Sequence, residues 1–196
     1  MFVYKRGSQD EAAPRARAQF CVPNTEWVAE VRAATPDDAC EVASIHVRAW
    51  QVAYRGLLPQ EYLDGLRPED RARRYTFGRT GPEHPAALVA VEHGVICGFV
   101  ITGPSHDSDL QDARELWAIY VDPQRWGIGV GRLLMAAARD RLCQDGAREA
   151  LLWVLAGNNR ARRFYQLDGW NCDGSRRTEV IGGVTAEELR YRRPLP

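Results

Sequence analysis

Apolar positions recur along the chain in short alternating runs and in helical stripes, which predict a regular series of elements from Trp27 to Arg193. The first element is a strand over residues 28–33, where apolar and polar positions alternate weakly. A helix begins at Thr35, because a threonine N-cap precedes Pro36 and two aspartates in the first turn. Its apolar residues have the three- and four-residue spacing of one helix face. They are Val42, His46, Ala49, Trp50 and Ala53.

The rest of the chain continues with strands and helices in a definite order. The predicted strands cover 87–91, 95–102, 115–121 and 150–155, with the last strands inside 170–193, and the further helices cover 59–66, 133–143 and 159–167. Glu92-His93-Gly94 indicates a hairpin, and residues 103–112 indicate a loop. A strand–helix–strand–helix unit follows the antiparallel strands, and its two strands should be parallel with a right-handed crossover. The fold class is therefore α/β with a mixed sheet.

Residues 1–25 differ in composition from the rest of the chain. They are charged, rich in alanine and arginine, and contain Pro14 and Pro23 without a sustained period. We interpret them as an arm outside the core, although a docked helical arm or an overlong start-site assignment would give the same pattern. Residues 26–196 then form one domain, since 196 residues suffice for one sizeable core and are few for two.

Charge and cysteine usage narrow the class of partner and the compartment. Lys plus Arg and Asp plus Glu are balanced at 26 each, so no bulk attraction to nucleic acid or membrane is expected. The five cysteines are scattered and never form a C-x-x-C pair, which fits reduced thiols. No apolar run approaches the ~20 residues of a membrane helix, and no secretory signal follows Lys5 and Arg6. We therefore expect a cytoplasmic protein.

The most specific feature is a glycine cluster between a strand and a helix, Val121-Asp122-Pro123-Gln124-Arg125-Trp126-Gly127-Ile128-Gly129-Val130-Gly131-Arg132. Glycines let the backbone approach a ligand, and the free N–H groups of the helix start suit a phosphate or pyrophosphate. A Walker loop is disfavoured because Gly131 precedes Arg132-Leu133 rather than Lys-Ser/Thr, and a dinucleotide G-x-G-x-x-G does not fit. A turn that only packs a helix on a strand is the alternative.

This segment resembles the acetyl-CoA-binding motif of the GCN5-related N-acetyltransferases (the GNAT superfamily), which reads Gln/Arg-x-x-Gly-x-Gly/Ala. The motif aligns on residues 126–131, with Gly129 and Gly131 matching and Trp126 standing where Gln or Arg is usual. Aligned one pair earlier, Gln124, Gly127 and Gly129 satisfy it literally. The variant residue leaves the backbone donors of the loop unchanged.

A second segment, residues 152–165, is similar to the family's later strand and helix. Asn158, Ala161, Phe164 and Tyr165 match its usual Asn-x-x-Ala-x-x-Phe-Tyr, although an Asn-capped helix with Phe164 in the core would have the same pattern. The spacing of the two segments and the element order over 27–193 also follow the family. The resemblance implies the GNAT fold, a mostly antiparallel sheet with a central parallel strand pair and flanking helices.

The resemblance implies an acetyl-CoA-dependent N-acetyltransferase, in which an amine attacks the thioester directly. An alkyl amine has a pKa near ~10, so a base or a water relay must remove a proton at pH 7. Tyr165 is the candidate general acid, as in the family, unless it only packs over the sheet. Glu115 is the candidate base unless it is a surface group at the strand end. Strand alternation would put Glu115 and Val121 on one face, with Leu116 and Tyr120 on the other.

The resemblance also implies which residues hold acetyl-CoA. The backbone of Ile119, Tyr120 and Val121 would pair with the pantetheine arm and polarise the thioester carbonyl. The other predicted contacts are Trp126, Gly127, Ile128, Gly129, Val130, Gly131, Arg132, Asn158, Arg160, Ala161 and Phe164. Arg125, Arg132 and Arg163 are candidate phosphate partners, although exposed arginines are common. His46, His84, His93 and His106 have no metal-ligand spacing, so no metal is expected.

The acceptor pocket is predicted between the first two helices and the last strand pair. Trp50, Tyr54, Arg55 and Tyr62 would lie on one side and residues 177–188 on the other. The acceptor is predicted to be a primary amine of a small molecule or of a peptide or protein N-terminus. A non-catalytic acyl-CoA sensor is the alternative, and a nucleotide-phosphate hydrolase is disfavoured by the missing Lys-Ser/Thr. Family members are often dimers, which leaves a homodimer open.

Overall fold

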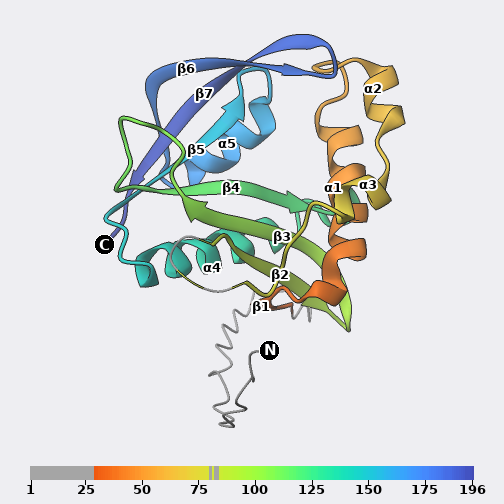
Figure 1. Ribbon diagram of the computed structural model, residues 1–196, viewed down its shortest axis with the longest axis horizontal. Coiled ribbons are helices and arrows are strands. Elements are labelled where there is room, and N and C mark those ends of the chain that lie inside the picture. The colour runs from red at the N-terminus through yellow and green to blue at the C-terminus, as the bar shows by residue number, and fades with distance from the viewer. Residues whose placement is uncertain (1–28, 80, 82–83) are drawn as a thin grey trace, which may run out of the picture.

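The computed structural model describes residues 29–79, 81 and 84–196. Within them a seven-stranded sheet has the order β1-β2-β3-β4-β5-β7-β6, with helices packed against it (Figure 1). The strands are β1 (Glu30–Ala33), β2 (Ala86–Glu92), β3 (Val95–Pro104), β4 (Arg114–Val121), β5 (Glu149–Leu155), β6 (Asn171–Ile181) and β7 (Val184–Pro194). The helices are α1 (Ala39–Ala53), α2 (Gln60–Gly65), α3 (Pro68–Ala72), α4 (Val130–Gln144) and α5 (Asn159–Leu167), with 3-10 turns η1 (Pro36–Asp38) and η2 (Pro123–Arg125). The predicted arm over 1–25 and the first residues of the predicted domain, 26–28, lie outside the described residues.

The sheet is antiparallel throughout the described residues except between β4 and β5, which are parallel. Helix α4 connects this pair, as a parallel connection requires a crossover. The predicted mixed α/β sheet with one central parallel pair is therefore confirmed. The predicted hairpin is β2–β3, and its turn residues His93 and Gly94 have φ of 50° and 81°, the positive values of a type I′ turn.

The first helix begins with an ion pair that ties it to β1. The Asp38 carboxylate accepts hydrogen bonds from the Thr35 N–H at 2.7 Å and from the Arg32 guanidinium at 2.7 and 2.8 Å. The hydrogen bonds from Arg32 hold the pKa of Asp38 well below its usual value, despite partial burial. Thr35 and Pro36 therefore open the helix where the sequence predicted, through the turn η1.

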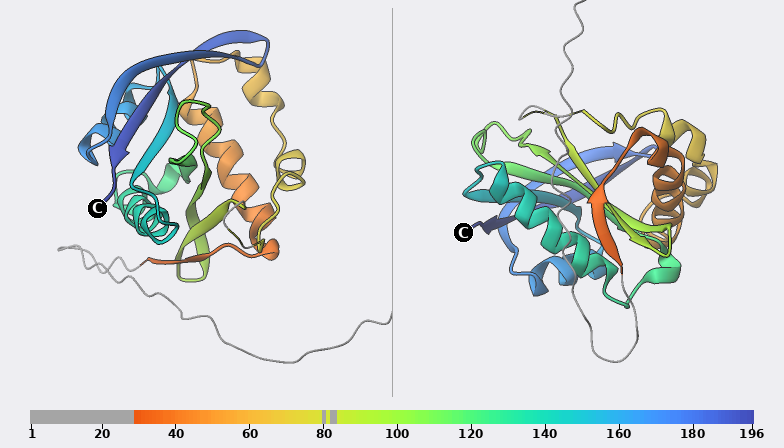
Figure 2. Two further views of the ribbon diagram at one scale, coloured as in Figure 1. Left: turned by 60° about the vertical axis from the view of Figure 1, so that its left-hand side comes forward. Right: turned by 90° about the horizontal axis from the view of Figure 1, so that it is seen from below.

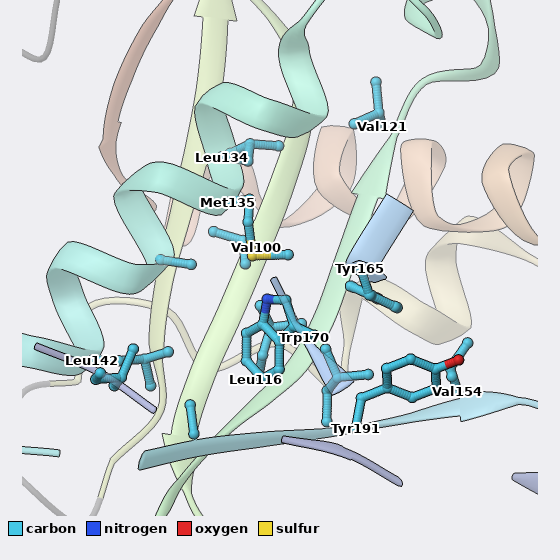
Figure 3. Close-up of a cluster of buried hydrophobic side chains, with 14 of the residues drawn as sticks. Val100, Leu116, Val121, Leu134, Met135, Leu142, Val154, Tyr165, Trp170 and Tyr191 are labelled. Carbon is cyan, nitrogen blue, oxygen red and sulfur yellow. The ribbon is translucent and has the colours of Figure 1, made fainter. Parts of the chain in front are cut away.

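Helices cover both faces of the sheet (Figure 2). One core cluster contains Leu134 and Leu142 of α4 with Tyr165 of α5 and Tyr191 of β7 (Figure 3). A second cluster joins Ile45 of α1 to β2 and β3 on the opposite face. Helices α4 and α5 thus share one face, and α1 covers the other.

Two local features differ from the predictions, the length of one strand and the presence of one short helix. Strand β3 runs two residues into the predicted loop, through Gly103 and Pro104. Helix α3 was not predicted, because residues 67–74 are almost wholly charged or polar and show no apolar stripe. Its signals were Pro68 at the first position and two acidic residues after it.

Strand β4 does not keep the strict alternation that was predicted. The register against β3 leaves Trp117 without a partner between Leu116 and Ala118, so Trp117 is the extra residue of a β-bulge. Leu116 therefore packs in the same core cluster as Val121, whereas Tyr120 packs in the cluster beneath α1. Ile119 lies on the same face as Val121 and Ala118 on the same face as Tyr120, as predicted, whereas the predicted face of Leu116 was wrong because the bulge shifts the alternation by one residue.

The parallel strands β4 and β5 pair only at their beginnings. Arg114 is opposite Ala150 and Glu115 is opposite Leu151, and no further pair follows between these two strands. Beyond that point the strands diverge, as Figure 1 shows. Strand β5 instead pairs with β7 along its whole length, from Glu149 to Leu155. The sheet is consequently open between β4 and β5 on the side where both strands end.

Candidate functional site

The glycine cluster forms a loop that leads directly into α4. Asp122 caps η2 by accepting a hydrogen bond from the Gln124 N–H at 3.0 Å. Gly127 and Gly129 have φ of 85° and 105°, values that residues with a side chain rarely adopt. Leu133 is the first residue whose N–H reaches a carbonyl four residues earlier, at Gly129. The N–H groups before it lack helical partners at the positive end of the dipole, which is a phosphate-binding arrangement.

A cavity of about 900 Å³ is lined by this helix start and by the diverging parts of β4 and β5. Helix α5 also contributes to its wall. The predicted site residues that line it are Ile119, Tyr120, Val121, Trp126, Gly127, Gly129, Gly131, Arg132, Asn158, Arg160, Ala161, Phe164 and Tyr165. Three elements that are distant in the sequence thus meet around one space.

Three predicted site residues lie outside this lining. Ile128 is 43% exposed, and Val130 is fully buried in the core beneath α4. Glu115 is buried where β4 and β5 still pair, and its Oε2 accepts a hydrogen bond from the His106 N–H at 3.2 Å. The imidazole Nδ1 of His106 lies at the same distance from that oxygen. Glu115 therefore faces the loop before β4.

Trp126, which replaces the usual Gln or Arg of the motif, is held in place by two contacts. Its indole N–H donates to the Val121 carbonyl at 2.9 Å. The Arg160 guanidinium lies 4.0 Å from the centre of the indole ring, within the range of a cation–π contact. Trp126 thus links the end of β4 to α5 across the mouth of the cavity.

The arginines around the helix start are not equivalent. Arg125 forms an ion pair with Glu92 at 2.7 Å, so its charge is already balanced. Arg132 and Arg163 also line the cavity, are exposed, and have no carboxylate partner in the described part of the chain. Among the described residues near the start of α4, these two arginines and Arg160 supply positive charge that no carboxylate balances.

Tyr165 lies on α5 and forms part of the cavity wall. The Asn158 side chain caps this helix by accepting from the Ala161 N–H at 3.1 Å, which confirms the predicted N-cap. The Tyr165 ring packs 5.6 Å from Phe164 and 6.4 Å from Trp170. Its hydroxyl makes no hydrogen bond to any described residue. Burial raises the pKa of Tyr165, so the phenol stays protonated at neutral pH.

The predicted acceptor side contributes aromatic side chains from α1, its C-cap and α2. Trp50, Tyr54 and Tyr62 line the cavity, and the hydroxyls of Tyr54 and Tyr120 are 3.4 Å apart. Burial raises the pKa of both phenols, in Tyr54 with a contribution from Tyr120. Arg55 was also predicted here, but it is exposed and lies outside the lining.

The β6–β7 hairpin closes the other side of the cavity. Its turn lies against α2, because a Cβ on Gly182 would be 2.5 Å from the Tyr62 ring (Figure 1). From the predicted range 177–188, Arg177 and Glu188 line the cavity and form an ion pair at 2.7 Å. The Arg177 guanidinium also lies 4.4 Å from the Trp153 ring.

Sequence reasoning missed several lining residues. Arg71 and Arg74 belong to α3 and the residues just after it, and Arg71 lies 5.2 Å above the Trp50 ring. They were missed with the helix itself. Trp153 was missed although strand alternation was a usable signal, since its neighbours Leu152 and Val154 face the core.

Neither a metal-binding cluster nor a membrane-spanning helix is present among the described residues. No group of three or more His, Cys, Asp or Glu side chains there could hold a metal ion. In the same part of the chain, no helix combines the length and the apolar character needed to cross a membrane.

Comparison with known proteins places this chain in one class of enzyme, the N-acetyltransferases. The family model described as the acetyltransferase (GNAT) family matches residues 41–170. The chain therefore belongs to the GNAT family, and the predicted fold and enzyme class are confirmed.

Individual relatives agree with this assignment. The chain is 29% identical over 136 residues to the uncharacterised N-acetyltransferase YuaI of Bacillus subtilis, covering 69% of this chain and 76% of the relative. It is 29% identical over 166 residues to a probable N-acetyltransferase of Mycobacterium tuberculosis, covering 83% and 91%. The structure of yncA, a putative acetyltransferase from Salmonella typhimurium solved with acetyl-CoA, has a TM-score of 0.65 at 18% identity and covers 86% of this chain and 94% of that one. The last comparison concerns the fold.

Proposed function

We propose that this enzyme transfers an acetyl group from acetyl-CoA to the primary amine of a small molecule or of a peptide or protein N-terminus. The observation that carries the proposal is a single cavity lined by both the free start of α4 and Tyr165. The Salmonella protein of the same fold contains acetyl-CoA, which supports the same co-substrate here.

In this proposal the acetyl-CoA pyrophosphate binds the N–H groups at the start of α4. Arg132, Arg160 and Arg163 supply positive charge at the same mouth of the cavity. The pantetheine arm lies between β4 and β5, where β4 has no strand partner beyond Glu115 on the β5 side. Backbone groups of Ile119 and Tyr120 are therefore available to pair with it. An extended ligand that pairs with an open strand edge is a common recognition mode.

Tyr165 is proposed as the acid that protonates the leaving thiolate. Support comes from its hydroxyl in the cavity wall, which has no hydrogen-bond partner among the described residues, and from burial, which raises its pKa and keeps the proton in place. General acid catalysis of this kind contributes about 10²–10⁴-fold to rate. Glu115 stays a prediction as the base, and its position outside the cavity lining gives that role no geometric support.

The test is to incubate the full chain with acetyl-CoA and a panel of amines, and to detect acetylated products by mass spectrometry. The panel should contain amino acids, polyamines, aromatic amines and short peptides with free N-termini. A product from one amine class would establish the activity and its acceptor. Tight acetyl-CoA binding without any product would count against transfer to amines of these kinds, and absent binding would refute the proposed role of the α4 start.

A further inference from the structure

Two glutamates lie on strands next to β5, at opposite ends of it. Glu115 of β4 is opposite Leu151, and Glu188 of β7 is opposite Leu155. Because a strand rises about 3.3 Å per residue, these two positions on β5 are roughly 13 Å apart. Glu115 is at the end where β4 and β5 pair, and Glu188 is at the end where they have separated. Glu188 lines the cavity, whereas Glu115 does not.

Strand alternation turns Glu188 toward the acceptor side of the sheet. Its neighbours Leu189 and Tyr191 pack in the core beneath α4, at one and three residues from it. Glu188 therefore points to the opposite face, the face covered by α1. Glu188 lines the same cavity as Tyr54 and Tyr120, and its charge adds a smaller contribution, after burial, to the raised pKa of both phenols.

One carboxylate oxygen of Glu188 is held while the other is available. Oε2 accepts a hydrogen bond from the Arg177 Nε at 2.7 Å. Oε1 accepts none within the part of the chain that the structure describes. The side chain is only 12% exposed, so its orientation is restricted by the ion pair and by the cavity wall. A carboxylate fixed through one oxygen can bind an ammonium group with the other.

We infer that Glu188, rather than Glu115, binds the acceptor ammonium and removes its proton in this reaction. The inference rests on the proposed function, which supplies the amine and the thioester. It adds the base and fixes the direction from which the acceptor enters, between the β6–β7 hairpin and the C-terminal end of α1.

The proton and bond changes balance as follows. Glu188 takes one proton from the ammonium, and the nitrogen lone pair forms a bond to the thioester carbonyl carbon. The carbon–sulfur bond then breaks, its electron pair stays on sulfur, and the thiolate takes a proton from Tyr165. The nitrogen loses its second proton, which restores the phenol, and Glu188 releases its proton to solvent. The products are the amide, the free CoA thiol and one proton.

A pH profile separates this role from a merely structural one. Below the amine pKa of about 10, the neutral fraction of the amine rises roughly tenfold per pH unit. An enzyme without its base depends on that fraction, so the loss caused by Glu188→Gln should shrink as pH rises. The ionisable groups on the acceptor side of the cavity are Tyr54, Tyr62, Arg71, Arg74, Tyr120, Tyr165, Arg177 and Glu179, and all of them are retained in this variant.

The experiment compares kcat/KM from pH 6.5 to 9.5 for the wild type and for Glu188→Gln, with the amine that the panel identifies. At pH 7 we expect a loss of about 10²–10⁴-fold, with acetyl-CoA affinity unchanged by calorimetry. The matched control is Glu187→Gln, which removes a carboxylate from the next position of β7. Glu187 forms the equivalent ion pair with Arg176 at 3.0 Å but lies outside the cavity lining, so its removal should leave kcat/KM unchanged.

Further outcomes decide the inference. A loss equal at every pH, or a Glu115→Gln variant that alone shows the pH-dependent loss, would overturn it. If Glu188→Gln no longer binds acetyl-CoA, Glu188→Asp replaces it, and a smaller loss with the same pH dependence would support the role. If the wild type forms product and Glu188→Gln has the same kcat/KM, this inference is overturned while the proposed function stands. No product from the wild type would overturn the proposed function, and the inference with it.

Discussion

Arg190 is the residue whose removal should damage the fold most directly. Its side chain, 8% exposed on β7, donates to Asp107 and Asp109 of the β3–β4 loop and to Asp173 of β6, at 2.7 to 2.9 Å. Asp107 also accepts from the Trp153 indole N–H at 3.2 Å. Arg190 therefore holds three carboxylates together behind Trp153, which forms part of the cavity wall.

The variant Arg190→Met would leave these carboxylates without their shared counter-ion. Asp107 and Asp173 are only 12% and 15% exposed, so their charges are poorly hydrated, whereas Asp109 at 61% contributes little. Removing one partner of a buried ion pair costs about 3–5 kcal/mol in the free energy of unfolding. At roughly 2–4 °C per kcal/mol for a chain of this size, the melting temperature should fall by about 6–20 °C.

The assay is thermal and urea unfolding followed by circular dichroism at pH 7. The control is Arg176→Met, which breaks an ion pair with Glu187 whose side chains are 63% and 44% exposed. Such exposed pairs are worth about 0–1 kcal/mol. A loss for Arg190→Met that is no larger than that of the control would refute the reasoning, because it would mean that the carboxylates rehydrate freely.

Lowering the pH should reduce the difference in unfolding free energy between the wild type and Arg190→Met. Hydrogen bonds from Arg190 lower the pKa of Asp109, and in Asp173 the Ser175 N–H and Arg190 outweigh burial with the same result. A carboxyl group whose pKa is lower in the folded state stabilises the fold when the pH is above its unfolded pKa of about 3.9. This stabilisation is lost as the pH falls below that value. In Arg190→Met, protonation instead relieves buried charge. The difference in unfolding free energy should therefore shrink from pH 7 to pH 3, and a constant difference would contradict this account.

Two further predictions concern the cavity, and a third concerns the packing of β3 against β4. Tyr165→Phe should lower kcat about 10²–10⁴-fold with acetyl-CoA affinity retained, and an unchanged kcat would remove Tyr165 from the acid role. Gly129→Ala should raise the acetyl-CoA Kd about 10- to 100-fold through loss of a charged hydrogen bond, whereas Gly146→Ala, with φ of 79° at the other end of α4, should leave Kd unchanged in calorimetry. Gly98→Ala would put a Cβ 2.8 Å from a β4 carbonyl oxygen and should cost about 1–3 kcal/mol by scanning fluorimetry; Gly65→Ala, with open space around it, should not.

Local signals allowed much of the fold, and many residues that line the cavity, to be predicted from the sequence. Thr35 and Asn158 are side-chain signals for helix starts, and both stand where the structure begins a helix or its leading turn. Gly127 and Gly129 have positive φ, which is the reason that these positions are glycine. Such features depend on residues a few positions apart, so they can be recognised in a single amino-acid sequence.

The parts that failed depend on contacts between distant segments. The bulge at Trp117 is a property of the β3–β4 register, and one extra residue there put Leu116 on the same face as Val121 rather than on the face of Tyr120. Arg71 reaches the cavity through a short charged helix whose position against α1 has no periodic signal. Glu115 was chosen from its place in the chain, and only the structure shows that its carboxylate faces His106.

The opening between β4 and β5 follows from competition for pairing rather than from any motif. Strand β5 pairs with β7 at seven positions, from Glu149 with Pro194 to Leu155 with Glu188, but with β4 at only two. It must therefore follow β7 away from β4, because a strand cannot keep both registers once its neighbours diverge. The same pairing places Glu188 beside Leu155, at the edge of the gap that it creates. The opening that we propose for the pantetheine arm thus has a carboxylate at its edge, which is why the proposed base belongs to β7.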